Sequence, residues 1–268
     1  MNLHDAGLAA AIGVIEGLTE FLPVSSTGHI LLADHFLGFG SPGGAFEIVI
    51  QLGAILAIVV LYFARLWQIA INIPQSAAAR RFVGALLLAF LPSVLVGVAL
   101  HDFIKKVLFA SPHLIAVTLI LGGFAILWIE KRSKRVVVES AETMPLRTAF
   151  WIGCCQCLAM VPGVSRSGAT IMGAMLLGVE RKAAAEFSFF LSLPTMFGAT
   201  AYDLYKNRAA LNVDDMGLIG IGFVCAFISA LVVVRLFIGF ISKHGFVPFA
   251  WYRIGLGALV IAALALGL

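Results

Sequence analysis

The chain has very little charge. Asp, Glu, Lys and Arg make up only 12% of its 268 residues, against about 25% in soluble domains. Hydrophobic residues make up 61%, and the mean hydropathy is +1.04. No polar segment is long enough for a separate soluble module, so we expect a single transmembrane domain over residues 1–268. The net charge of +4 lies in predicted loops, which indicates membrane topology and no nucleic-acid partner.

Two further features are missing. The N-terminus has neither the basic residues nor the uninterrupted apolar core of a signal peptide, so we expect it to be retained. The four cysteines all fall in apolar segments and lack the spaced pairs of a zinc site. We therefore expect them to be reduced, buried packing residues.

Apolar runs dominate the rest of the chain. Six of them are long enough to cross a bilayer, at about 20 residues each. They cover residues 46–64, 82–100, 113–130, 184–205, 216–241 and 248–268. Two more, 6–38 and 148–178, are interrupted near the middle by proline, glycine and polar residues. Their arms are too short to cross, which favours broken re-entrant helices whose breaks are buried in protein or line a cavity.

The order of these segments indicates an internal repeat. A broken helix and three spans are followed by a second broken helix and three spans, so the second half enters the membrane from the opposite side. Val24–Gly28 also matches Val164–Gly168 at an offset of 140 residues. We predict an all-α polytopic membrane protein, with six transmembrane helices plus two broken re-entrant helix pairs in an inverted-topology repeat. Repeat 1 covers about 1–135 and repeat 2 about 145–268.

The loop cations predict the orientation. Loops on one side hold eleven Lys and Arg residues and those on the other hold four, so the richer side is cytoplasmic and both termini face outward. Arg235 and Arg253 lie near predicted span ends, where we expect them to extend to the headgroups. Arg166 lies at the tip of a broken helix and therefore requires an anion.

Two carboxylates lie in the first broken helix. Glu16 and Glu20 are four residues apart, so they share one face of a helix. Such a pair is tolerated in an apolar segment if one carboxyl is protonated, if a divalent cation bridges them, or if they face a wet cavity. Mg²⁺ or Ca²⁺ suits these oxygen ligands and also binds substrate phosphates. An exposed pair at the membrane interface is the alternative.

Hydroxyls follow the proline in each broken helix. Ser25-Ser26-Thr27-Gly28 and Ser165-Arg166-Ser167-Gly168 are typical of helix N-caps, and two facing helix N-termini form an anion site. Simple capping and close packing is the alternative for each hydroxyl. His29 can act as an acid or base beside these groups, or can be a packed polar residue. Glu47 and Glu186 are candidate supporting residues, one of them for Arg166.

These motifs resemble those of the undecaprenyl-diphosphate phosphatase family, integral membrane enzymes associated with bacitracin resistance. The resemblance rests on Glu16–His29 and Pro162–Thr170 and extends over nearly the whole chain. It implies hydrolysis of undecaprenyl diphosphate to undecaprenyl phosphate and inorganic phosphate, which recycles the carrier lipid for cell-wall polymer synthesis. It also implies a bacterial plasma (inner) membrane location, an active site that faces the periplasm, and a required divalent cation.

The resemblance also implies roles for individual residues. The catalytic set is Glu20, Ser26, His29 and Arg166. Substrate contacts are expected from Ser25, Thr27, Ser165, Ser167, Gly168 and Thr170. Glu16 and Glu20 would hold Mg²⁺ or Ca²⁺.

Two questions stay open at this point. The attacking group is either the Ser26 hydroxyl or a directly activated water, with Ser26 then binding phosphate. The partners are a polyprenyl diphosphate lipid and the membrane, and a homodimer is left open. The alternative function is a secondary transporter or lipid flippase that uses the same midplane site, because many transporters combine inverted repeats with broken helices.

Overall fold

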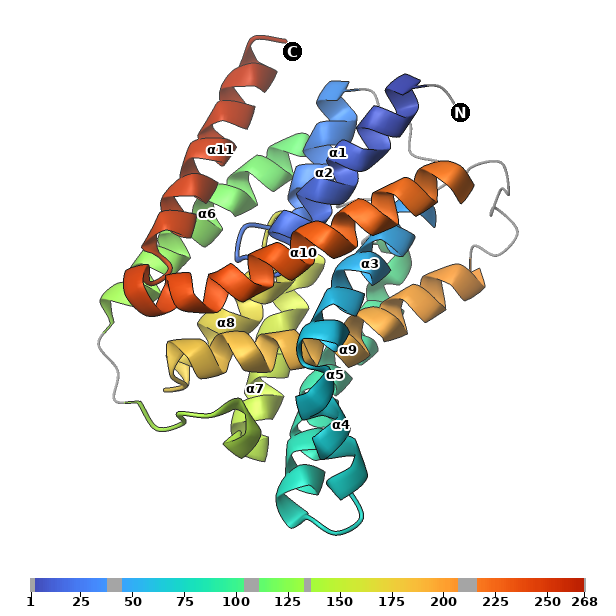
Figure 1. The fold of residues 1–268 in the computed structure, drawn as a ribbon. Helices are drawn as coiled ribbons and strands as arrows, with labels where there is room; N and C mark the ends of the chain where they lie inside the picture. The colour runs from blue at the N-terminus through green and yellow to red at the C-terminus, as the bar shows by residue number, and fades with distance from the viewer. Residues whose placement is uncertain (1–2, 38–44, 104–110, 133–135, 207–215, 268) are drawn as a thin grey trace.

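A computed structural model describes residues 3–37, 45–103, 111–132, 136–206 and 216–267. These residues form helices, and their only β-type pairing is an isolated bridge between Val138 and Val179 (Figure 1). The helices are α1 Leu3–Thr19, α2 Ser26–Leu37, α3 Ala45–Leu61, α4 Phe63–Asn72, α5 Ala77–Phe103, α6 Pro112–Lys131, η2 Ala141–Thr143, α7 Leu146–Gln156, η3 Cys157–Met160, α8 Arg166–Leu176, α9 Arg181–Lys206, α10 Met216–His244 and α11 Val247–Ala265. Several loop cations used to predict the orientation lie outside the described residues: Lys105, Lys106, Lys134, Arg135 and Arg208.

The structure confirms a helical, multi-span protein. Among the described residues, α5, α6, α10 and α11 are long and apolar enough to cross a membrane. The α3–α4 pair, bent by 73°, makes a fifth candidate if it is counted as one span. Helix α9, which the sequence predicts as a span, is not among them. It carries Ser188, Ser192 and Thr195, which lower its hydropathy, and the first two are buried inside the protein.

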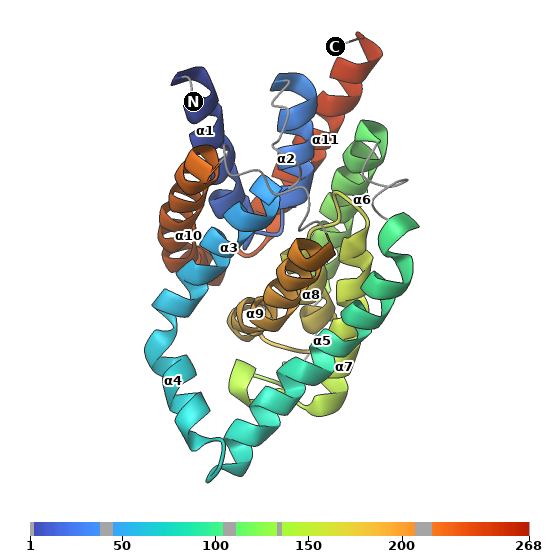
Figure 2. The ribbon, with the colours of Figure 1, turned by 90° about the vertical axis from the view of Figure 1, so that its right-hand side faces the viewer.

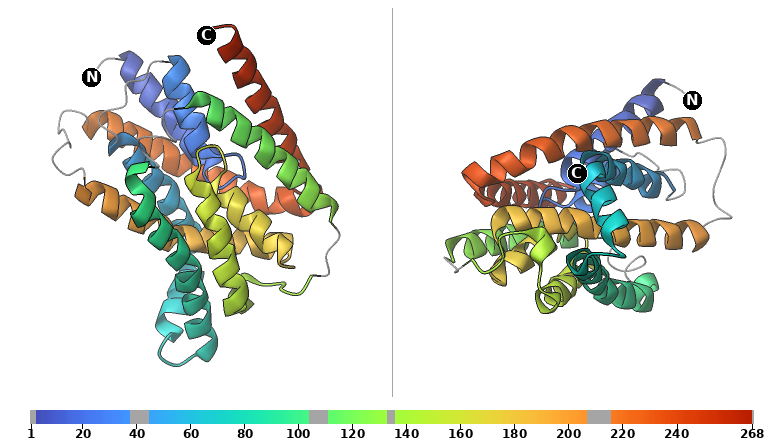
Figure 3. Two further views of the ribbon diagram at one scale, coloured as in Figure 1. Left: turned by 180° about the vertical axis from the view of Figure 1, so that it is seen from behind. Right: turned by 60° about the horizontal axis from the view of Figure 1, so that its bottom comes forward.

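Both predicted broken helices break near their prolines. Helices α1 and α2 form one hairpin with its turn at residues 20–25, and α7, η3 and α8 form the other with its turn at 161–165. The first hairpin lies at the end of the molecule where both termini are found, and the second approaches from the other end (Figure 1). The two turns lie side by side in the middle of the molecule (Figure 3, left), where the Ser167 hydroxyl donates to the Leu22 carbonyl at 2.6 Å.

Small residues let the hairpins pack closely on long helices. Helix α1 contacts α10 and α7 contacts α5, while α6 pairs with α11 and α3 with α9 (Figure 2). Gly13 lies directly on the backbone of Gly222, and Gly153 lies in the same way on Ala89. A Cβ on either glycine would overlap that backbone. Close backbone approach of this kind is the usual source of packing energy between helices in lipid.

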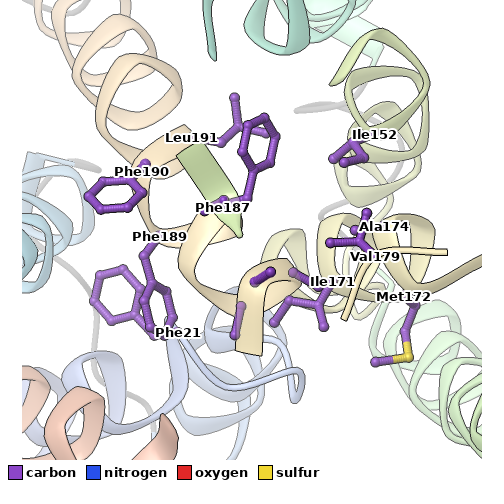
Figure 4. Close-up of a cluster of buried hydrophobic side chains, with 14 of the residues drawn as sticks. Phe21, Ile152, Ile171, Met172, Ala174, Val179, Phe187, Phe189, Phe190 and Leu191 are labelled. Carbon is purple, nitrogen blue, oxygen red and sulfur yellow. The ribbon is translucent and has the colours of Figure 1, made fainter. Parts of the chain in front are cut away.

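An aromatic cluster fixes the turn of the first hairpin. Phe21 is fully buried and meets Phe189 of α9 edge to face, with ring centroids 5.5 Å apart (Figure 4). Phe190, next along α9, packs edge to face on Tyr62 and Phe82. Each such pair contributes about 0.5–1.5 kcal/mol beyond simple burial. Because Glu20 immediately precedes Phe21, this packing determines where its carboxylate lies.

Candidate active site

Two serines with unusual backbone conformations begin the returning helices. Ser25 and Ser165 have φ of 71° and 77°, and they are the only non-glycine residues with positive φ in the described part of the chain. Such conformations cost about 1–3 kcal/mol each and persist only where the surroundings hold them. Each hydroxyl accepts a backbone N–H three residues on, from Gly28 at 3.2 Å and from Gly168 at 3.0 Å. The expected capping is therefore present at both turns.

The carboxylate of Glu20 lies between the two helix N-termini. Arg166, the first residue of α8, donates from Nη2 to Oε1 at 2.7 Å. Ser26, the first residue of α2, donates from Oγ to Oε2 at 2.5 Å. Glu20 is only 6% exposed, so both contacts are sheltered from bulk solvent. Arg166 thus finds the anion that the sequence requires, and it comes from the other hairpin.

The remaining hydrogen bonds of the Arg166 guanidinium go to α9. Its Nη1 donates to the carbonyl of Ser188 at 3.1 Å, and the Ser188 hydroxyl lies 2.7 Å from that of Thr170. Its buried Nε has no hydrogen-bond partner among the described residues. Glu186, considered as a partner for Arg166, instead accepts from Arg65 at 2.9 Å. One donor of the Arg166 guanidinium is therefore left without a partner in the described part of the protein.

A small polar cavity opens at this contact. Its volume is about 160 Å³. The predicted site residues that line it are Glu20, Ser25, Ser26, Thr27, Ser165 and Arg166. Gln51, Met160 and Met196 also line it, and the sequence analysis did not assign them to the site because none belongs to either hydroxyl motif. A larger cavity of about 480 Å³ between α5, η3 and α9 is mostly apolar, and Met160 and Arg166 line both.

Three predicted substrate contacts lie behind the cavity. The Ser167 hydroxyl donates to Leu22, Gly168 donates its N–H to Ser165, and Thr170 bonds to carbonyls of its own helix and to Ser188. These bonds hold the backbone of the second hairpin. None of the three residues is among those lining the polar cavity.

His29 lies on another side of its helix. Its Nδ1 is 2.7 Å from the carbonyl of Ser25, and its Nε2 is 2.7 Å from the hydroxyl of Tyr252, whose ring lies parallel to the imidazole. Since a carbonyl only accepts, Nδ1 carries the hydrogen, and in the neutral imidazole Nε2 then accepts from the Tyr252 hydroxyl. His29 does not line the polar cavity, and its catalytic role stays a prediction.

Glu16 is the group best suited to a metal ion. Its side chain is fully buried, and neither carboxylate oxygen has a hydrogen-bond partner among the described residues. No cluster of three or more His, Cys, Asp or Glu residues occurs in that part of the chain. Two carboxylates are nevertheless enough for Mg²⁺ when waters and substrate phosphates complete its coordination. The oxygen donors of Glu16 and Glu20 therefore fit a divalent cation by their chemistry, but only Glu20 is among the residues that line the polar cavity.

The sequence prediction for Arg253 is wrong. Arg235 is exposed on α10, but Arg253 is 1% exposed and bonds only to backbone carbonyls in the centre of the protein. Its neighbours Trp251 and Tyr252 resemble an interfacial aromatic belt, so the local sequence carries no sign of this burial.

Two opposing hairpins with a charged cavity between them, set among helices of membrane-spanning length, define a multi-span helical membrane protein with an internal polar site. More specifically, the chain belongs to the bacitracin resistance protein BacA family, whose model matches residues 9–259. It is 58% identical over 264 residues to an undecaprenyl-diphosphatase of Paracoccus denitrificans, covering 98% of this chain and 99% of that protein. Proteins of the same name from Phenylobacterium zucineum and Caulobacter vibrioides are each 56% identical, covering 98% of this chain and 99% and 98% of theirs.

Proposed function

We propose that the protein hydrolyses undecaprenyl diphosphate to undecaprenyl phosphate and inorganic phosphate, and so recycles the carrier lipid for cell-wall polymer synthesis. The observation that carries the proposal is the Glu20 carboxylate, held at once by Ser26 and Arg166. A nucleophile, its base and a phosphate-binding cation thus meet in one small cavity. Relatives that match nearly the whole chain are named for this activity.

The two adjoining cavities suit an amphiphilic substrate. The polar cavity of about 160 Å³ takes the diphosphate, and the apolar cavity of about 480 Å³ takes the first part of the isoprenoid chain. Arg166 lines both, so its guanidinium lies where headgroup and chain would join. A free nucleotide or a sugar phosphate would leave the apolar cavity empty, which favours a prenyl diphosphate.

The contacts support a covalent route. The Ser26 hydroxyl attacks the terminal phosphorus, its proton passes to Glu20, and the bond to the bridging oxygen breaks, releasing the lipid monophosphate. Water then attacks phosphoserine, Glu20 returns its proton to the departing Ser26 oxygen, and both hydrogens of the water leave with inorganic phosphate. Arg166 and the N–H groups of the two helix N-termini stabilise the charge that builds on the transferred phosphoryl group.

A divalent cation, Mg²⁺ or Ca²⁺, belongs to this proposal. Glu16 and Glu20 would hold it, and the unpaired oxygens of Glu16 support that assignment. When bound, it supplies positive charge that neutralises the diphosphate.

The finer features of the fold are also proposed here. Gly13 and Gly153, like Ser25 and Ser165, are separated by the same 140 residues and make matching contacts in the two halves. This agreement supports a single domain built as an inverted repeat, with α9 and the α3–α4 pair completing six spans. We place this domain in the bacterial inner membrane. The positive-inside rule then orients it with the site facing the periplasm.

Phosphate release in detergent tests the activity against the transport alternative. Hydrolysis needs one compartment, whereas transport needs two. Purified protein in micelles should release inorganic phosphate from undecaprenyl diphosphate, and an Arg166→Ala variant should not. Binding of the lipid without any phosphate release would instead favour a transporter or flippase at the same site.

A further inference from the structure

Arg253 of α11 joins the two hairpin turns. Its Nη1 donates to the carbonyl of Pro23 in the first turn at 2.9 Å and to that of Val164 in the second at 3.0 Å. Its Nη2 donates to Gly163 in the second turn at 2.8 Å. One planar group therefore bonds to turns that are about half the chain apart in sequence.

The remaining donors of Arg253 bond to α6. Nη2 also reaches the carbonyl of Thr118 at 3.2 Å, and Nε reaches that of Leu119 at 3.3 Å. The side chain of Thr118 itself donates to Pro162 at 2.6 Å, which adds a second link from α6 to the second turn. All five N–H groups of the guanidinium are thus used, and only arginine among the side chains has five donors in a rigid plane. None of the ion pairs within the described residues includes Arg253.

The bonded carbonyls lie next to the catalytic groups. Val164 immediately precedes Ser165, and Pro23 stands two residues before Ser25, the two positions of positive φ. A turn that is held by hydrogen bonds from another helix can keep a positive φ, whereas an unrestrained turn relaxes to a more favourable backbone conformation. The distance between Glu20 and Arg166 likewise depends on how the two turns are held against each other.

We propose that Arg253 is a positioning residue that clamps the two hairpin turns in register, so that Ser26 and Arg166 meet the same carboxylate. The clamp acts through geometry as well as charge, because five carbonyls in two turns and a helix require the guanidinium fork. The catalytic consequence rests on the proposed phosphatase function, whereas the clamp itself does not.

Two variants perturb the clamp in different ways. Arg253→Lys keeps the charge but offers three donors to five carbonyls. Gly122→Ala keeps Arg253 and displaces it, because a Cβ on Gly122 of α6 would overlap the guanidinium. The matched controls are Arg235→Lys, an exposed arginine of α10, and Gly255→Ala, whose Cβ would meet open space on α11.

Steady-state kinetics on the folded fraction of each variant test the catalytic role. Both clamp variants should lower kcat by about 100-fold with KM changed less than about threefold, because misplacement of reacting groups by about 1 Å has an effect of this size. Both controls should match wild type. A purely structural role predicts fewer folded molecules with normal kcat, and that result would overturn the proposal.

Hydrogen exchange separates this inference from the proposed function. In both clamp variants, peptides covering residues 20–26 and 160–166 should exchange faster together, and this readout needs no activity. If wild type releases no phosphate, the function fails while exchange still tests the clamp. Faster exchange in only one turn, wild-type kcat in Arg253→Lys, or failure of both clamp variants to fold would each refute a positioning role.

Discussion

Replacing Arg166 by methionine should destabilise the protein through Glu20. The two side chains are 13% and 5% exposed and their charged atoms are 2.7 Å apart, so the variant leaves a carboxylate buried without its partner. Removing one member of a buried ion pair costs about 3–5 kcal/mol. For a chain of this size, that corresponds to a fall in Tm of about 10 °C.

A double-mutant cycle measures this coupling directly. Thermal unfolding in detergent would be followed for wild type, Arg166→Met, Glu20→Gln and the double variant. The double variant should recover about 1–3 kcal/mol relative to the sum of the single effects, because neither charge is then left alone. Arg132→Met, which removes an exposed cation stacked on Trp128, serves as control and should change stability by less than about 1 kcal/mol. Strictly additive single effects would show that Arg166 and Glu20 are not paired in the folded protein.

Three further outcomes follow from particular contacts. A chelator should abolish phosphate release and added Mg²⁺ should restore it. Glu16→Gln should raise the Mg²⁺ concentration needed for half-maximal rate by about 10-fold or more. An unchanged Mg²⁺ concentration at half-maximal rate would exclude Glu16 as a ligand. Ser167→Ala removes the 2.6 Å bond between the hairpins but leaves the Leu22 carbonyl its bond from the Val24 N–H, so it should cost only about 0.5–1.5 kcal/mol in thermal unfolding; no loss would show that this bond does not hold the hairpins together. Gly153→Ala should lower the free energy of unfolding by about 1–3 kcal/mol, because its Cβ would overlap the backbone of α5. Gly84→Ala is the control, because its Cβ would meet open space, and it should not lower stability in this way. Equal stability of the two variants would argue against the close α5–α7 contact.

Local chemistry made much of the site predictable. Pro23 and Pro162 mark the breaks, and the Ser and Gly residues after them mark the caps, because these preferences act within a few residues. The cost of a charge in an apolar segment made Arg166 require an anion, and the nearest acids in the other motif include Glu20. The structure shows that Glu20 is this anion, whereas Glu186, which the sequence analysis considered for Arg166, pairs with Arg65.

Tertiary packing decided the features that the sequence did not predict. The carbonyl partners of Arg253 lie up to 230 residues away, and backbone carbonyls carry no residue-specific signal. Helix α9 is polar for a span because Ser188 and Ser192 face protein instead of lipid. The contact between His29 and Tyr252 also depends on tertiary packing, because the two residues are 223 positions apart in sequence.

The most direct test of the proposed chemistry is a rapid acid quench during turnover of undecaprenyl diphosphate labelled at its terminal phosphate. If Ser26 is the nucleophile that Glu20 activates, the label should appear on the peptide that contains Ser26 before inorganic phosphate reaches its steady rate. Ser26→Ala should neither acquire label nor release phosphate. Hydrolysis at a normal rate with no labelled protein at any quench time, or a Ser26→Ala variant with near-normal turnover, would contradict this account.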